Sequence, residues 1–327
     1  MIEQTPSVSV TSYEPDYADV WEKIVAQSGT GTMLHTRRFI SYHGERFRDR
    51  SLMLEDRRGK VVGVFPAAES AVDPEMIVSH PGLTYGGLVH NGSVRGAQMV
   101  EALEAIVTHY RRLGYRRLQY KVVPPIYRSV LADDDLYALF RLSAQRYRCD
   151  LSSAIDLSRR GKVSHSRPQR RRRAEAEGVA AMENWSDIAG FWQILEQNLS
   201  RRHGAAPVHS LEEIRVLHDL FPDEILLMVA KIGTMLVGGI VLFLGGPVMK
   251  AQYTATTEEG RAKFALDPVI EQAIELAKER GCRFFDFGTN TADNGWTLSQ
   301  DLYQFKTSFG AGGVVYEHYE VELDDQG

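Results

Sequence analysis

The chain has 327 residues, 43% of them hydrophobic, and a formal net charge of −5 at pH 7. This length and composition predict a globular protein with room for two ordinary domains or one large one. The negative net charge excludes the basic field over the whole molecule that many nucleic-acid-binding proteins use. We therefore expect a protein of enzyme size.

The sequence indicates a cytoplasmic protein without a metal site. Its two cysteines, Cys149 and Cys282, lie far apart, which excludes a disulfide framework and fits a reducing compartment. Residues 1–13 lack the apolar core of a signal peptide, and the longest apolar run, 235–244, is too short to span a bilayer. No His-Glu-x-x-His or Cys/His ligand spacing occurs.

The first half of the chain predicts a strand, a loop, a helix and a second strand. Residues 59–65 read as a strand after a tight turn, and residues 80–87 form a turn-rich segment. Apolar residues at intervals of three and four predict a helix over 100–110, and Gly114 ends it. Residues 118–121 predict the second strand.

The second half repeats this order. Residues 233–241 and 248–254 predict strands, residues 266–277 a helix that ends at Gly281, and residues 282–287 a further strand. The repeat predicts an α/β (α+β) protein of two similar tandem domains, each a mixed, twisted sheet flanked by helices. The alternative is the plain alternation of elements that any α/β protein shows.

The junction between the two halves lies near residue 150. Residues 150–157 predict a strand, residues 158–169 a polar linker, and the residues from Arg170 onward a short helix. We therefore expect an N-terminal domain over 1–150 and a C-terminal domain, carrying the catalytic segment, over 151–327.

An arginine run is the strongest local charge feature of the chain. It consists of Arg167, Arg170, Arg171, Arg172 and Arg173. Arginine forks match the geometry of phosphate, so the run could contact a nucleotide, a lipid diphosphate or RNA. The alternative is a solvated helix face whose charge Glu175 and Glu177 balance.

Two polar loops carry histidines. The loop 79–87 brings His80 and Tyr85 together with glycines, and the loop 201–210 contains His203 and His209. Loops with such side chains often line substrate pockets. The alternative is that these histidines have structural roles in turns.

The segment after the last apolar strand carries the groups best suited to catalysis. Asp286 ends that strand, where α/β proteins place active-site groups, and could take or orient the proton of an attacking amine, or cap its own loop. Lys306 lies between Phe305 and Phe309 and could stabilise a phosphate or an oxyanion, or be a surface lysine. No Gly-x-Ser-x-Gly motif indicates covalent catalysis.

Several short motifs occur in a distinctive order along the second half. They are the arginine-rich helix, Phe191-Trp192, Pro207-Val208-His209-Ser210, Gln252-Tyr253, Asp286-Phe287-Gly288 and Leu302-Tyr303-x-Phe305-Lys306-x-x-Phe309-Gly310. This order resembles the Fem-type branch of the GNAT acyltransferase superfamily, whose members are double-GNAT proteins related to the peptidoglycan interpeptide-bridge aminoacyltransferases. The resemblance implies transfer of an acyl or aminoacyl group to an amine, without a metal and without a covalent enzyme intermediate.

The resemblance assigns a role to one candidate residue, and the other roles are expectations from the residue types and their positions. Lys306, in its Phe-Lys-x-x-Phe segment, is implied as an active-site residue, and we expect Asp286 and Tyr253 to be catalytic with it. We expect the substrate-binding residues to be His80, Tyr85, His203, His209, Gln252, Asn290 and Phe305. The run Arg170, Arg171, Arg172 and Arg173 is expected to contact the phosphates of the donor.

Two donors are compatible with the resemblance. Members that use acyl-CoA hold its pyrophosphate in a Gln/Arg-x-x-Gly-x-Gly/Ala turn, whereas residues 257–265 here have one glycine and two acids. Fem-type relatives use aminoacyl-tRNA. We expect no tightly bound cofactor, one of these two co-substrates, and a small amine or amino-sugar acceptor. The alternative is a non-catalytic GNAT-like binding or scaffold protein in a natural-product or polysaccharide pathway.

Overall fold

The computed structural model describes residues 7–323, except for the side chains of Arg202 and His203. The chain divides into two compact units. The first unit comprises the residues up to Asp150 together with Asp293–Trp296 and the residues from Val315 onward, and the second comprises Leu151–Ala292 and Thr297–Val314.

The described part of the first unit is built from short strands and four α-helices. Its elements are β1 (Val8–Ser12), α1 (Ala18–Gln27), α2 (Arg37–Ser41), β2 (Leu52–Asp56), β3 (Val61–Phe65), β4 (Ala68–Glu69), β5 (Met76–Val78), β6 (Val89–His90), α3 (Ala97–Arg112), β7 (Arg117–Lys121) and α4 (Asp134–Arg141). Strands β1, β2, β3 and β6 form one antiparallel sheet in that order. The helix predicted over 100–110 and the strand predicted over 118–121 are confirmed as α3 and β7.

Alternate residues of β2 pack into two different cores. Leu52 and Leu54 belong to the cluster that includes α3, whereas Met53 belongs to the cluster of Trp21 on α1. Because successive side chains of a strand point to opposite faces, α1 and α3 cover opposite faces of this sheet.

The second unit is a larger mixed sheet between helices. Two strands, β8 (Gln145–Asp156) and β16 (Gly312–Glu322), have residues in both units. The other elements of the second unit are α5 (Ser166–Ala176), β9 (Val179–Glu183), α6 (Ile188–His203), α7 (Leu211–Leu220), β10 (Ile225–Ile232), β11 (Met235–Gly245), β12 (Val248–Thr256), α8 (Glu258–Ala262), α9 (Leu266–Glu279), β13 (Phe284–Thr289), β14 (Thr291–Ala292), β15 (Thr297–Leu298) and α10 (Gln300–Thr307). The strands lie in the order β8-β13-β12-β11-β10-β9, and only the pair β12 and β13 is parallel in this series.

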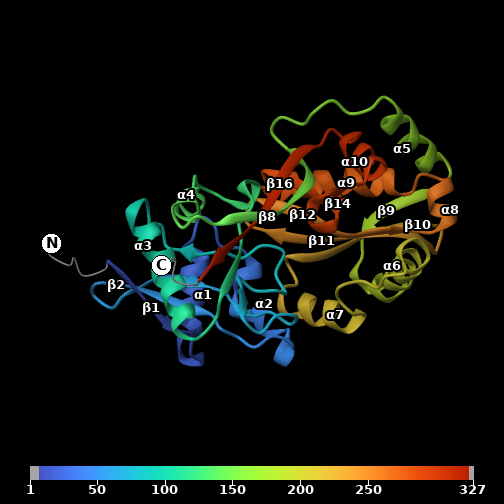
Figure 1. Cartoon of the computed structure of the whole chain (residues 1–327). Helices are drawn as coiled ribbons and strands as arrows, with labels where there is room; N and C mark the ends of the chain where they lie inside the picture. Colours follow the sequence, from blue (N-terminus) through green and yellow to red (C-terminus); the bar gives the residue numbers. More distant parts are fainter. Residues whose placement is uncertain (1–6, 324–327) are drawn as a thin grey trace. The chain divides into compact units, whose positions relative to one another are not determined.

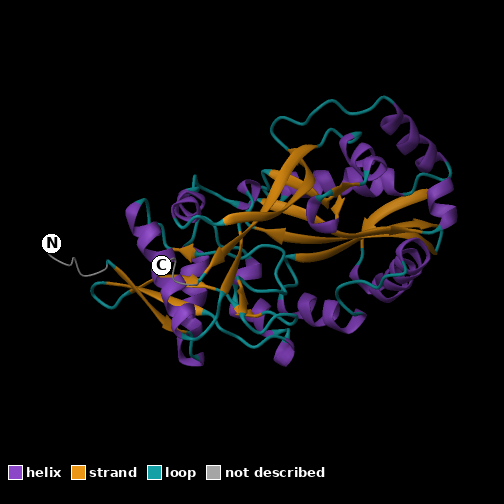
Figure 2. Ribbon diagram, in the orientation of Figure 1, coloured by secondary structure: helices purple, strands orange, loops and turns teal. Residues whose placement is uncertain are grey.

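Helices cover both faces of the second unit's sheet, as Figures 1 and 2 show. Helix α9 buries its apolar stripe, including Val269, Ile270 and Ala273, against one face. On the other face, Trp192 of α6 packs edge-to-face against Tyr253 of β12. The strands predicted over 233–241, 248–254 and 282–287 and the helix predicted over 266–277 are confirmed as β11, β12, β13 and α9.

Strand β16 explains why the last residues group with the first unit. It pairs antiparallel with β7, with His318 opposite Lys121. From sequence, every residue after 150 was predicted to belong to the second domain. Local patterns do not reveal that a C-terminal strand pairs with a strand some 200 residues earlier.

Helix α5 begins at Ser166, four residues earlier than the sequence predicted. The predicted linker over 158–169 was therefore too long at its C-terminal end. Pro168 suggested a loop, but it lies in the first turn of the helix, where a missing N–H breaks no intrahelical hydrogen bond. As a result, Arg167 belongs to the helix and not to a linker.

Candidate active site

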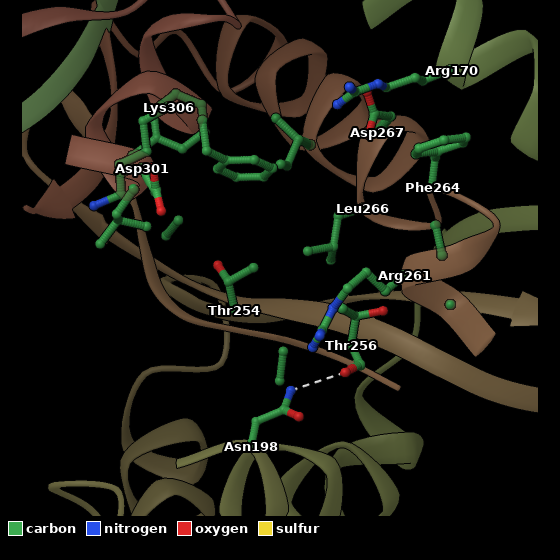
Figure 3. A pocket seen from close by; sticks show the side chains of 18 of the residues that line it. Arg170, Asn198, Thr254, Thr256, Arg261, Phe264, Leu266, Asp267, Asp301 and Lys306 are labelled. Carbon is green, nitrogen blue, oxygen red and sulfur yellow. Dashed lines mark hydrogen bonds between the residues drawn. The ribbon is translucent and has the colours of Figure 1, made fainter. Parts of the chain in front are cut away.

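A pocket of about 710 Å³ lies within the second unit (Figure 3). Residues from α5, α6, β12, α8, α9, β13 and α10 line it. Its walls are largely apolar, with Phe264, Leu266, Ile270, Phe287 and Phe305 among the lining residues. A concave, mostly apolar space of this size with a few polar groups is typical of a site for a small molecule.

The pocket exists because β12 and β13 separate. Their parallel pairing ends at Lys250 and Asp286, although both strands continue further. Beyond this point Thr254 of β12 and Phe287 of β13 line the pocket instead of pairing with each other. The sheet therefore opens a gap at the C-terminal ends of two parallel strands, where α/β proteins commonly bind ligands.

A bulge in β12 adds a polar element to this gap. Val241 of β11 lies opposite Tyr253 and Leu242 lies opposite Ala251, so Gln252 has no counterpart on β11. Gln252 also lines the pocket. Bulges re-aim backbone and side-chain groups and are common beside active sites.

Lys306 of α10 is buried at the wall of the pocket, with 6% of its surface exposed. Its Nζ donates hydrogen bonds to the carbonyl oxygens of Gly288 and Thr289, each at 2.8 Å. Burial lowers the pKa of Lys306 to about 8, while the charge of Asp286 acts in the opposite direction. An ammonium group has three N–H donors, and two of them have partners among the described residues, so one remains for a ligand.

Asp286 lies behind Lys306 in the interior and is fully buried. Its Oδ1 accepts hydrogen bonds from Ser152 Oγ at 2.7 Å and from the backbone N–H of Gly288 at 2.9 Å. The described residues that line the pocket include Lys306 but not Asp286. These contacts hold the loop after β13 and place a carboxylate near Lys306.

A second lysine, the half-buried Lys250, lies close enough to the buried Asp286 and Lys306 for their charges to interact. Lys250 lies opposite Asp286 in the parallel register of β12 and β13. Burial lowers the pKa of Lys250, and the charge of Asp286 raises it. Sequence reasoning missed this residue, although a single lysine within the apolar strand 248–255 was a signal that could have identified it.

Arg167 holds α10 against α9. Its guanidinium donates to both carboxylate oxygens of Asp267 at 3.1 Å, to Ser308 Oγ at 2.8 Å and to the carbonyl oxygen of Phe305 at 3.3 Å. The same group lies 4.0 Å from the ring centroid of Phe309. Because it binds the last turn of the helix that carries Lys306, Arg167 positions that lysine.

The other arginines of the run lie in different surroundings, one at the pocket and three on the surface. Arg170 lines the pocket, and its guanidinium lies 5.2 Å from the ring centroid of Phe264. Arg171, Arg172 and Arg173 are exposed and are not among the lining residues, and two of them pair with the glutamates at i+4, Arg171 with Glu175 and Arg173 with Glu177. Arg261 of α8, which was not among the predicted site residues, also lines the pocket.

The predicted residues Tyr253 and His209 contact each other and are not among the residues that line the pocket. The Tyr253 hydroxyl contacts the His209 ring nitrogen Nδ1 and accepts from the His209 backbone N–H at 3.3 Å. Burial raises the pKa of Tyr253 to about 12, so the phenol keeps its proton at neutral pH. Their neighbour Gln252 does line the pocket.

The remaining expected substrate contacts lie in several places. His80 and Tyr85 are buried in the first unit, where burial lowers the pKa of His80 to about 3 and Tyr85 donates to Thr32 Oγ1 at 3.3 Å. Asn290 is buried and donates to the Leu151 carbonyl and to Ser153. The side chain of His203 lies outside the described residues. Phe305, by contrast, lines the pocket.

Two further properties concern only the described part of the chain. Within residues 7–323, no group of three or more His, Cys, Asp or Glu side chains is arranged to hold a metal ion. None of the helices described there combines the length and the apolar character that a membrane span requires.

The sequence of the second unit matches a known family. Residues 161–303 match the family model of the acetyltransferase (GNAT) domain, a span that includes β12, β13 and the loop before α9. The second unit thus carries a GNAT domain, and the chain is an acyltransferase, as its motifs predicted. No curated protein matches the chain.

Solved structures extend the likeness to nearly the whole chain. FemX is 12% identical with a TM-score of 0.67, over 96% of this chain and 97% of its own. L-PGS from Bacillus licheniformis is 12% identical with a TM-score of 0.61, over 96% and 92%. A tandem GNAT protein from the clavulanic acid biosynthesis pathway is 12% identical with a TM-score of 0.54, over 98% and 100%. These likenesses confirm the predicted fold of two GNAT-like domains.

Proposed function

We propose that the chain is an N-acyltransferase that moves an acyl or aminoacyl group from an activated donor to an amine by direct attack. The observation that carries this proposal is the setting of Lys306. It is a buried ammonium group with two carbonyl partners and a third N–H available at the wall of an apolar pocket. A preorganised cation in a site of low dielectric stabilises negative charge that develops during a reaction.

The proposed reaction begins when the acceptor nitrogen attacks the carbonyl carbon of the donor. The carbonyl oxygen becomes an oxyanion, and Lys306 donates a hydrogen bond to it. The backbone N–H at the Gln252 bulge is a candidate second donor. The bond from the carbonyl carbon to the donor's oxygen or sulfur then breaks, an amide forms, and the leaving group takes a proton.

The amine must also lose a proton. Asp301 lines the pocket from the same helix as Lys306 and is exposed, so it is a candidate base, directly or through a water molecule. We assign Asp286 a different role. Its position behind Lys306 and its bonds to Ser152 and Gly288 favour balancing the lysine charge and capping the loop.

The donor is proposed to be acyl-CoA or aminoacyl-tRNA. Acyl-CoA is a candidate because GNAT domains typically use it as a co-substrate. Aminoacyl-tRNA is a candidate because residues 257–265 differ from the usual pyrophosphate-binding turn. The acceptor is proposed to be a small amine or an amino sugar. Arg170 is the member of the arginine run in position to contact a donor phosphate in the pocket.

The test is a matrix of acyl-CoAs and aminoacyl-tRNAs against simple amines and amino sugars, with the native chain and two variants. Lys306→Ala should abolish product formation with whichever donor is active. Lys278→Ala, which removes an exposed lysine paired with Glu275, is the control and should keep full turnover. Full activity of Lys306→Ala would refute the mechanism, and the absence of turnover across the matrix would favour the scaffold alternative.

A further inference from the structure

Two lysines of the second unit, Lys250 and Lys306, approach the same glycine. Lys306 Nζ donates to the carbonyl oxygen of Gly288 at 2.8 Å. The Cε atom of Lys250 lies 3.9 Å from the position that a Cβ atom at Gly288 would occupy. Gly288 has a φ of +80°, which glycine adopts without strain, and its missing side chain leaves this space open. The fold therefore brings two ammonium groups to one turn of the backbone.

The two lysines share one acidic side chain. Lys250 lies opposite Asp286 in the register of β12 and β13, and the charge of Asp286 favours the protonated form of both lysines. In the described part of the chain, no other acidic side chain acts on the charge of either lysine. Two ammonium groups beside one carboxylate leave a positive charge unbalanced. Because such a charge is costly away from bulk water, the cluster favours a negatively charged ligand.

Lys250 has all its N–H groups available for that ligand. Among the residues that the structure describes, its ammonium group has no hydrogen-bond partner, and it interacts with Asp286 through charge alone. Lys306, by comparison, donates to two carbonyl oxygens. The Lys250 side chain is half-buried, so a ligand can reach it. An ammonium group binds a carboxylate or phosphate oxygen more strongly than a neutral acceptor.

The side chain of Lys250 points to the face of the sheet opposite to α9. Its neighbours Met249 and Ala251 belong to the core cluster of α9, as do both neighbours of Asp286. Because successive side chains of a strand alternate between faces, Lys250 and Asp286 point to the other face. The described residues that line the pocket accordingly include Lys306 but not Lys250. A group bound to Lys250 thus lies outside the pocket that we assign to the donor.

We infer that Lys250 binds an acidic group of the acceptor, either a carboxylate or a phosphate. The acceptor is then an acidic amine, such as an amino acid, a phosphorylated amino alcohol or an acidic amino sugar. Its anion pairs with Lys250, and its amine attacks the donor carbonyl carbon beside Lys306. The inference rests on the proposed function and deepens it, because it names the chemical class of the acceptor.

Two sets of matched amines test whether an acidic group is recognised. The first set is ethanolamine, glycine and O-phosphoethanolamine, and the second is glucosamine, glucosaminuronic acid and glucosamine 6-phosphate. With the active donor, kcat/KM should be at least about tenfold higher for an acidic member than for the neutral member of its set, as expected for a hydrogen bond between charged groups. The better acid distinguishes carboxylate from phosphate. Equal values within both sets would overturn the inference.

Variants of Lys250 assign the preference to this side chain. Lys250→Met should raise KM for the acidic acceptor about tenfold and leave KM for the neutral acceptor unchanged, whereas Lys250→Arg keeps the charge and should keep most of the preference. A purely structural role would lower the rates with both acceptors alike. Lys278→Met, at an exposed lysine paired with Glu275, is the control and should behave as the native chain does. An unchanged preference in Lys250→Met would contradict the assignment.

Calorimetric titration of the same amines, without a donor, separates this inference from the proposed reaction. The native chain should bind an acidic member at least about tenfold more tightly than the neutral member, and Lys250→Met should lose that difference. This binding pattern without turnover would support the role of Lys250 and refute the proposed reaction. Turnover without any preference for an acid would support the reaction and refute the role of Lys250.

Discussion

Each unit of the chain has a lysine that donates to backbone carbonyl groups, half-buried in the first unit and buried in the second, and the two lysines differ in one respect. Lys121 in the first unit donates to the carbonyl oxygens of His80, Pro81 and Leu83 at 3.1, 3.1 and 2.8 Å. Lys306 in the second unit donates to two carbonyl oxygens. Burial lowers both pKa values, to about 7 for Lys121 and to about 8 for Lys306.

The number of partners separates a structural lysine from a catalytic candidate. Three acceptors satisfy the three N–H groups of Lys121, which therefore holds the loop after β5 and has no donor left. Lys306 keeps one donor and lines the pocket. A lowered pKa alone would have indicated both lysines as catalytic candidates. The number of hydrogen-bond partners indicates only Lys306.

The largest expected effect is on catalysis by a Lys306→Met variant. Loss of one preorganised donor to an oxyanion lowers kcat by about 100- to 1,000-fold. Thermal unfolding should remain cooperative, because methionine fills most of the same volume. Steady-state kinetics with the active donor measures the loss. A variant within threefold of native turnover would remove the distinction between the two lysines.

Lys121→Met should show the reverse pattern. Three carbonyl groups would lose their donor, which we expect to cost about 2 kcal/mol of stability in denaturant titration. Turnover per folded molecule should stay near the native value. A large fall in kcat with unchanged stability would instead assign a catalytic role to the first lysine.

Arg167→Lys tests whether the position of Lys306 matters as well as its presence. Lysine keeps the charge beside Asp267 but cannot also reach Ser308 and the Phe305 carbonyl with one planar group. We expect kcat to fall about tenfold with little change in KM, since small displacements of a catalytic group are costly. A change confined to KM would show that Arg167 acts on binding and not on positioning.

The smallest effect is on pH dependence. Activity should decline above pH 8, where Lys306 loses its proton, and a Lys306→Arg variant should lack that decline in its residual activity.

The stability of the fold should change with pH in the opposite sense. The folded pKa of about 8 lies below the unfolded value of 10.5, so the unfolded chain holds more protons between these limits and stability rises with pH there. Lys306→Met should lack this part of the rise, as unfolding measured at pH 8 and 10 would show.

The sequence allowed most of the second unit to be predicted. Regular apolar spacing located α9, and a short apolar run located β13, because the 3.6-residue and two-residue periods are local properties. The order of motifs identified the family and marked Lys306. Gln252 and Phe305 were likewise selected from sequence, and both line the pocket.

The arginine run shows that the local sequence pattern does not predict the surroundings of each side chain. Arg167, Arg170 and Arg171 look alike in sequence, yet one is buried on Asp267, one lines the pocket and one pairs with Glu175 on the surface. Their different surroundings come from α9 and α10, which lie about a hundred residues or more further along the chain.

The sequence by itself thus determined the elements, the family and the lysine segment, since these depend on neighbours along the chain. Only the tertiary structure decided which charges meet. It placed Lys250 opposite Asp286, separated β12 from β13 to open the pocket, and gave Lys306 two partners where Lys121 has three. Those outcomes depend on strand register and on packing between distant segments, because the energy of a buried charge is set by the groups that the fold brings around it.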